Sequence, residues 1–189
     1  MTTVPAINNE EIIDATRRWL EKAVIGLGLC PFAESVYVRD GVRFQVSEQS
    51  SAAGLLAQLR SELMHLHRAD ARQCETTLLI HPWVLTDFME FNEFLALCDD
   101  AVSELELEGE IQVASFHPQY QFAGTQPDDI ENYTNRSPFP TLHLLREASV
   151  ERALAGVPDP QSIYENNILR LRELGFPGWQ ALWKDKGHH

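Results

Sequence analysis

The chain has 189 residues, of which 44% are hydrophobic, and it carries a formal net charge of −13 with a pI near 4.9. This length and apolar content predict one domain that buries a substantial core. The acidic balance argues against nucleic acid or an anionic membrane as a partner, and no run of about 18 apolar residues predicts a membrane-spanning helix.

The first third of the chain predicts a helix, a strand and a second helix. The first helix is expected from about Asn9 to Ile25, with Gly26 as its stop and an apolar stripe made of Ile12, Ala15, Trp19 and Ala23. After the turn "GLGLCPF", the alternating segment "VRFQVS" (42–47) predicts a strand. A helix that begins at a serine follows, and its apolar face consists of Leu55, Leu59, Leu63 and Leu66.

Strands and helices continue to alternate along the chain as far as residue 116. "TTLLI" (76–80) predicts a buried strand and "IQVASF" (111–116) another. The helix between them has the clearest apolar spacing, formed by Phe88, Phe91, Leu95, Cys98, Val102 and Leu105. A long polar loop is expected over 118–140, functional or partly flexible. "TLHLLRE" predicts a fourth strand or a helix start, residues 150–155 predict a helix, and a last helix is expected from about Pro160 to Leu174, ended by "GFPGW".

This order predicts an α/β fold. We expect a mixed, mainly parallel sheet of three to four strands with crossover helices, in a single compact domain over residues 1–187. The first three strands would then end at one edge of the sheet, where open α/β sheets usually bind ligands. Glu48, His81 and His117 each follow a strand at that edge. Both histidines precede a proline, which ends a central strand.

His81 and His117 are therefore the first candidates for catalysis. Neutral imidazole serves as a general acid or base and also as a metal ligand. The alternative is a pair of strand-end histidines bonded to loop backbone. A metal site would need further ligands from Asp128, Asp129, Glu48 or His143, and because no HxH or HExxH spacing is present, no metal site is predicted.

Cys30 is a candidate nucleophile. It precedes Pro31 and could cap a short helix through "PFAESVYV", where the helix N-terminus would lower the pKa of the thiol. The alternative is a small buried residue in a turn that follows a helix. Cys98 lies on an apolar stripe and is expected in the core.

The segment "NRSPFPTLHLLRE" (135–147) returns the chain from the polar loop. Arg136 could anchor a carboxylate or phosphate, with Asn135, Ser137 and Glu48 as further substrate-binding candidates. The alternative for Arg136 is a surface salt bridge. Asp128 and Asp129 are expected to cap a helix. His143 and Arg146 are three residues apart, so on a strand they would face opposite sides, with His143 more typical of a core or interface residue.

The three cysteines, Cys30, Cys74 and Cys98, are odd in number and lack CxxC spacing, which favours reduced thiols in a cytosol. The start "MTTVPAINNEE" lacks a signal-peptide pattern, so we expect a cytoplasmic protein. The terminal "GHH" is typical of a tag remnant and is set aside. No GxGxxG, P-loop or GxSxG motif indicates a cofactor or a known reaction.

The segments "GLGLCPFA", "FHPQYQFAG" and "NRSPFPTLHLLRE", together with the His-Pro steps, resemble the bacterial domain-of-unknown-function family numbered 1415. The resemblance covers nearly the whole chain, from the first helix to "LGFPGW". It implies a small, single-domain, cytosolic bacterial protein and brings no established activity, cofactor or catalytic residue.

From the residues alone, the leading hypothesis is an enzyme that acts on a small anionic metabolite, with His81 or His117 as acid or base, Arg136 as anion anchor and Cys30 as nucleophile. One alternative is a non-catalytic binding or assembly protein that uses the 118–140 loop and the tail that carries Trp179 and Trp183. Another is a metal-dependent hydrolase. The sequence leaves the oligomeric state open.

Overall fold

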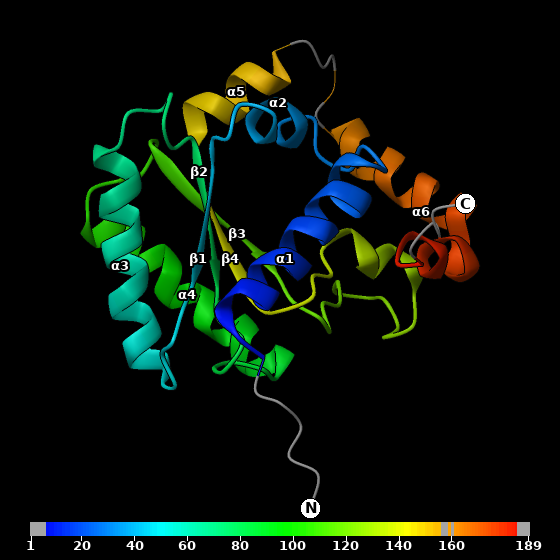
Figure 1. Cartoon of the computed structure of the whole chain (residues 1–189), viewed down its shortest axis with the longest axis horizontal. Helices are drawn as coiled ribbons and strands as arrows, with labels where there is room; N and C mark the ends of the chain where they lie inside the picture. Colours follow the sequence, from blue (N-terminus) through cyan, green and yellow to red (C-terminus); the bar gives the residue numbers. More distant parts are fainter. Residues whose placement is uncertain (1–6, 156–158, 160, 185–189) are drawn as a thin grey trace, which may run out of the picture.

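The computed structural model describes residues 7–155, 159 and 161–184, and it shows one sheet with helices on both faces (Figure 1). The strands are β1 (Val42–Val46), β2 (Thr76–Ile80), β3 (Ile111–Phe116) and β4 (Thr141–Arg146). The α-helices are α1 (Asn9–Trp19), α2 (Ala33–Tyr37), α3 (Ala52–Arg68), α4 (Phe88–Glu104), α5 (Glu147–Leu154) and α6 (Gln161–Leu182). A π-helix, η1 (Leu20–Ile25), continues α1, and a 3-10 helix, η2 (Ile130–Thr134), lies in the polar loop.

The sheet is mixed, with strand order β1-β2-β4-β3. β1 pairs with β2 in parallel, but β4 lies between β2 and β3 and is antiparallel to both. The predicted α/β class and the fourth strand are confirmed, whereas the prediction of a mainly parallel sheet is wrong. The reason is the connection after β3: it is a loop that stays at the edge where β3 ends, so the chain re-enters the sheet in the opposite direction.

Each face of the sheet has its own core. Leu79, Leu142 and Leu144 point to one face and pack with α3 and α4, whereas Leu78, Ile80 and Leu145 point to the face covered by α1 and α2 (Figure 1). Within β4, alternation places His143 beside Leu78 and Ala114 on the α1 face. Arg146 instead donates to the carbonyl groups at the end of α3. The prediction that these two residues face opposite sides is confirmed.

The predicted helix starts carry side-chain caps. Asn8 forms a capping box with Glu11, Ser51 accepts from the amide of Gly54, and Asp87 accepts from two amides of α4. The last helix extends further than predicted. Gly175 breaks it with φ 60°, but helical turns resume at once within "GFPGW" and reach Leu182.

Some predictions fall on residues outside the described part of the chain. These are the N-terminal pattern in residues 1–6, the start of the last helix at Pro160 and the terminal "GHH". Among the described residues, no helix is long and apolar enough to cross a membrane.

Candidate functional site

His81 and His117, the two histidines that precede a proline, lie at the edge of the sheet where β2 and β3 end. The amide of His81 donates to the carbonyl of Pro140, and the amide of His117 donates to that of Asn135, so both strand ends are bonded to the returning loop. The two rings pack on Phe91 of α4, with centroid distances of 5.5 Å for His81 and 5.1 Å for His117. The structure therefore brings together the two histidines that the sequence placed at one edge.

The ring of His81 is a neutral imidazole in a closed site. Its Nδ1 lies 2.9 Å from the carbonyl oxygen of Val84, which can only accept, so Nδ1 carries the hydrogen. Its Nε2 is buried and has no hydrogen-bond partner among the described residues. Burial, with a smaller contribution from the neighbouring His117, lowers the pKa of His81 to about 4.

His117 is also buried, and both of its nitrogens are used by loop backbone. Nδ1 accepts from the amide of Gln119 at 3.0 Å, and Nε2 donates to the carbonyl of Leu85 at 3.3 Å. Leu85 has φ 54°, an uncommon conformation for a residue with a side chain. Burial lowers the pKa of His117 as well. As the structure stands, neither ring offers an atom to a molecule in solvent.

Arg136 is bound by the loop to which it belongs. Its Nε donates to the carbonyl of Tyr120 at 3.2 Å, and an Nη donates to that of Pro127 at 2.5 Å. Its guanidinium lies 4.3 Å from the ring centroid of Tyr133, a cation–π distance. Trp19 of α1 donates to the Arg136 carbonyl. These contacts tie the loop to α1 and bond the guanidinium to loop carbonyls. Among the described residues Arg136 forms no salt bridge, and its role as an anion anchor stays a prediction.

The other predicted binding residues also have intramolecular partners. Asn135 donates to the Ser115 carbonyl, and Ser137 is buried and donates to that of Phe139. Glu48 is exposed and accepts from Asn9 at the start of α1. Glu48 therefore joins β1 to α1.

The polar loop is ordered around a residue that the sequence analysis did not single out. Asn132 in η2 is fully buried. Its Oδ1 accepts from the Phe122 amide and the Thr125 hydroxyl, and its Nδ2 donates to the Gln126 carbonyl at 2.7 Å. Asp129 holds the predicted N-cap position of η2, but its carboxylate accepts from the Gln126 amide instead. The only sequence signal was a long loop without apolar period.

No metal centre is formed by the described residues, where no three His, Cys, Asp or Glu side chains are grouped closely enough to hold an ion. The ligands considered from sequence are dispersed: His143 lies on the α1 face, Glu48 is bonded at the start of α1, and Asp129 is used within the loop.

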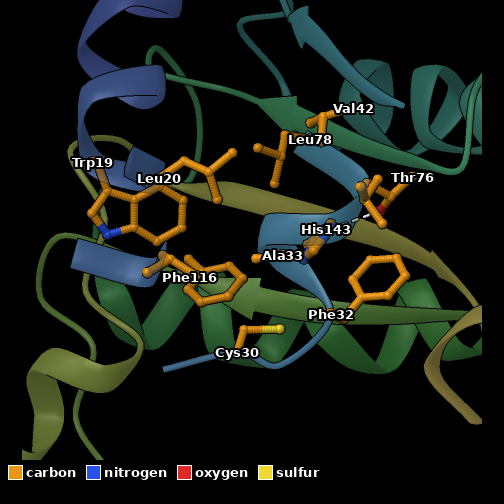
Figure 2. A pocket seen from close by; sticks show the side chains of 12 residues that line it. Trp19, Leu20, Cys30, Phe32, Ala33, Val42, Thr76, Leu78, Phe116 and His143 are labelled. Atoms are coloured by element: carbon orange, nitrogen blue, oxygen red, sulfur yellow. Dashed lines mark hydrogen bonds between the residues drawn. The ribbon is translucent and has the colours of Figure 1, made fainter. Parts of the chain in front are cut away.

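A second candidate site is a group of hollows away from the two His-Pro histidines. Three adjoining hollows lie on the α1 face of the sheet and share Cys30 and Phe116 in their walls, and we call them together the Cys30 cavity. The two larger ones have volumes of about 300 Å³ and 230 Å³, and the innermost about 40 Å³. Figure 2 shows the innermost hollow, with Trp19, Phe32 and His143 around it. A cavity of this size, mainly apolar with a few polar groups, is typical of small-molecule sites.

Cys30 does not cap α2, because the helix starts at Ala33 and Phe32 holds the N-cap position. That local prediction is wrong. Burial raises the pKa of the Cys30 thiol despite hydrogen bonds from the Phe32 and Ala33 amides, so the thiol is protonated at neutral pH. Of the three cysteines, Cys30 is the half-buried one, whereas Cys74 and Cys98 are buried, as expected for Cys98.

His143 supplies the imidazole of the Cys30 cavity. Its Nε2 lies 2.7 Å from the hydroxyl oxygen of Thr76 on β2. Burial lowers the pKa of His143 to about 4, so the ring is neutral at pH 7. The ring is still partly accessible, because it forms part of the walls of two of the hollows.

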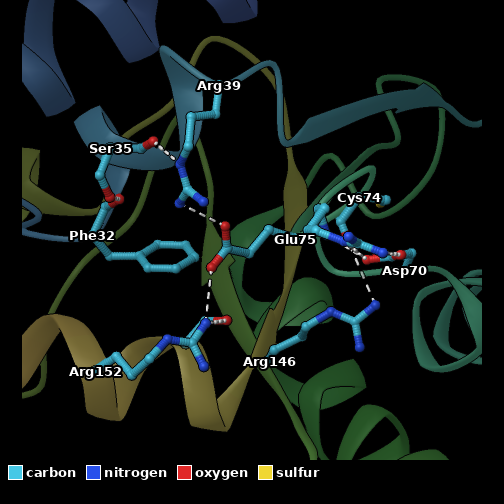
Figure 3. Close-up of polar contacts among 10 residues, drawn as sticks. Phe32, Ser35, Arg39, Asp70, Cys74, Glu75, Arg146 and Arg152 are labelled. Carbon is cyan, nitrogen blue, oxygen red and sulfur yellow. Dashed lines mark hydrogen bonds and ion pairs between the residues drawn. The ribbon is translucent and has the colours of Figure 1, made fainter.

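A buried carboxylate holds two walls of the cavity in place. Glu75, only 5% exposed, accepts from Arg39 after α2 at 2.8 Å and from Arg152 of α5 at 3.2 Å (Figure 3). Both arginines are largely exposed, which limits the stabilisation each pair gives through solvent screening. The arrangement nevertheless ties α2 and α5 to the start of β2, and α2 and α5 supply Val36 and Ala153 to the cavity wall.

Comparison with known proteins gives a family and no more. No curated protein and no solved structure matches the chain. One family model, described as "Protein of unknown function (DUF1415)", matches residues 11–181. That match includes every strand, both histidines of the sheet edge and the whole wall of the Cys30 cavity. The chain therefore belongs to the DUF1415 family.

Proposed function

We propose that this protein binds a small, mainly apolar organic molecule in the Cys30 cavity. The observation that carries the proposal is the meeting of three hollows at Cys30 and Phe116, between the sheet and helices α1, α2, α5 and α6. The innermost hollow is an unfilled volume that sacrifices packing contacts, and the two larger hollows adjoin it. A ligand would restore those contacts.

The chemistry of the cavity supports binding more than nucleophilic catalysis. A reactive cysteine needs a thiolate, which a cationic neighbour stabilises. Here the pKa of Cys30 is raised and that of His143 is lowered, so both groups are neutral at pH 7. From the odd number of cysteines and their lack of CxxC spacing we also propose a reduced, cytoplasmic location.

Filling the cavity tests this proposal. Ala153→Phe places a ring in the hollow between β4 and α5, and we expect it to weaken binding of neutral aromatic compounds at least tenfold. Binding is measured by thermal shift, where a ligand at a hundredfold excess over Kd stabilises the wild type by roughly 2.7 kcal/mol. The matched control is Ala148→Phe, an exposed position on the same helix. Equal binding by both variants would place the ligand elsewhere and refute the proposal.

A second candidate is the enzyme for small anionic metabolites at the sheet edge. One observation favours it: His81 and His117 converge at that edge with both rings neutral at pH 7. It requires the segment around Leu85 to open, because both rings are buried. A partner surface on Trp179 and Trp183 has less support, since Trp179 is buried between Tyr133 and Trp183.

Small anions test the second candidate. If the edge is the site, phosphate or succinate raises the melting temperature of the wild type, and Arg136→Gln abolishes the rise because the guanidinium is the predicted anion anchor. The control is Arg18→Gln, an exposed arginine on α1. A wild-type protein that does not respond to either anion removes this candidate.

A further inference from the structure

The hydrogen on the Thr76 hydroxyl determines which nitrogen of His143 is protonated. The Thr76 oxygen lies 2.6 Å from the Leu144 carbonyl oxygen and 2.7 Å from His143 Nε2. A carbonyl can only accept, so the single hydroxyl hydrogen goes to Leu144. His143 Nε2 must then donate to Thr76. A neutral imidazole carries one N–H, and Nδ1 is therefore left with a free lone pair.

The lone pair on Nδ1 is available to a molecule in the cavity. The described residues provide no hydrogen-bond partner for this atom. In the described part of the chain, the buried side-chain atoms that lack a partner are His81 Nε2 and Arg146 Nε, and His143 Nδ1 is not among them. His143 Nδ1 therefore keeps contact with open space, and the open space beside this ring is the Cys30 cavity.

The remaining wall of the cavity offers no charge to a ligand. The described residues that line the three hollows include no lysine, arginine, aspartate or glutamate. Two of the wall amides are already used, because Asn135 donates to the Ser115 carbonyl and Asn167 to the Leu29 carbonyl, and the third, Gln112, is exposed and uncharged. A carboxylate or phosphate would be desolvated there without a counter-charge, at a large cost in free energy.

We propose that the Cys30 cavity takes a neutral, mainly apolar molecule that carries one hydroxyl or N–H group, which donates to Nδ1 of His143. This inference rests on the proposed binding function and adds the chemical class of the ligand. The ligand proposed for this cavity is neutral, whereas the ligand expected at the sheet edge is an anion.

Three probes of the same shape test the inference: 1-naphthol, 1-methoxynaphthalene and 1-naphthoate. They present a donor, a neutral acceptor and an anion on one ring system, and their Kd values are measured by calorimetry at neutral pH. Naphthol should bind roughly tenfold more tightly than methoxynaphthalene, the contribution of one buried hydrogen bond. Naphthoate should bind most weakly. If none of the three binds, the proposed function fails, whereas tight binding of naphthoate or equal binding of the two neutral probes overturns only the inference.

A variant assigns the preference to one atom. His143→Gln can keep a donor toward Thr76 but removes the acceptor at Nδ1, so the preference for naphthol over methoxynaphthalene should disappear. His65→Gln is the same change on an exposed residue of α3 and should retain it. If Cys30→Ala removes the preference and His143→Gln does not, the sulfur is the acceptor and the inference is wrong.

A measurement on the wild type does not depend on how well the variants fold. The 15N shift of His143 Nδ1 should be that of an unprotonated ring nitrogen and should move toward the protonated value when naphthol binds. A protonated Nδ1 in the free protein would overturn the inference.

Discussion

Acidification from about pH 7.5 to about pH 5 is expected to lower the free energy of unfolding by about 4 kcal/mol through His81 and His143 alone. The pKa of each lies at about 4 in the folded protein, against an ordinary value of 6.5. The unfolded chain therefore binds protons first as the pH falls. The stability is fully present above pH 6.5 and declines toward pH 4, by about 1.4 kcal/mol per pH unit and per group. His117, whose pKa is also lowered, adds to the decline.

Urea unfolding at a series of pH values measures this effect. His143→Gln removes one titrating ring, so its stability should change less steeply with pH than that of the wild type. His65→Gln, on the exposed face of α3, should follow the wild-type slope. A wild-type stability that stays constant between about pH 7 and about pH 5 would contradict the prediction and would imply that the buried rings accept protons at little cost.

The polar loop is expected to depend on one side chain. Asn132→Ala should lower the free energy of unfolding by about 3 kcal/mol, because it removes three partly buried hydrogen bonds, to the Phe122 amide, the Thr125 hydroxyl and the Gln126 carbonyl, at about 1 kcal/mol each. Asn132→Asp keeps the size and the acceptor but loses the Nδ2 donor. It should therefore also be destabilising, because the carboxylate would face the Gln126 carbonyl.

Denaturant midpoints and amide hydrogen exchange measure the loss. Exchange should rise first at Phe122, the amide bonded directly to Asn132, and at His117, whose amide donates to the Asn135 carbonyl. Asn166→Ala, an exposed position on α6, is the matched control and should change the midpoint little. A loop in Asn132→Ala that still protects the Phe122 amide would show that backbone turns alone order the segment.

Local patterns predicted the secondary structure well, because apolar spacing and caps act within a few residues. The strands at Thr76–Ile80 and Ile111–Phe116 agree with their predicted bounds, and Ser51 caps the helix that was expected to begin at a serine. The position of β4 was not predictable in this way. Whether residues 141–146 pair at an edge or between two strands depends on partners far away in the sequence.

The candidate site was predicted only in part, for a related reason. The His-Pro steps located His81 and His117 at one edge, since proline ends a strand locally. The Cys30 cavity, by contrast, is enclosed by ordinary apolar side chains from several helices and strands, and an unfilled volume leaves no local pattern. His143 stood out as the one ionisable residue between apolar neighbours in β4, but its partner Thr76 lies 67 residues away.

The central place of β4 has a consequence for how the chain can be made. A nascent chain that ends before Thr141 contains β1, β2 and β3 but lacks the strand that separates β2 from β3. The facing edges of β2 and β3 then present unpaired N–H and C=O groups, which invite pairing with other chains. The sheet is completed only when the segment 141–146 leaves the ribosome and inserts between two strands already synthesised. Fragments that stop at residue 140 are therefore poor candidates for an independent folding unit, although they contain both histidines and the polar loop.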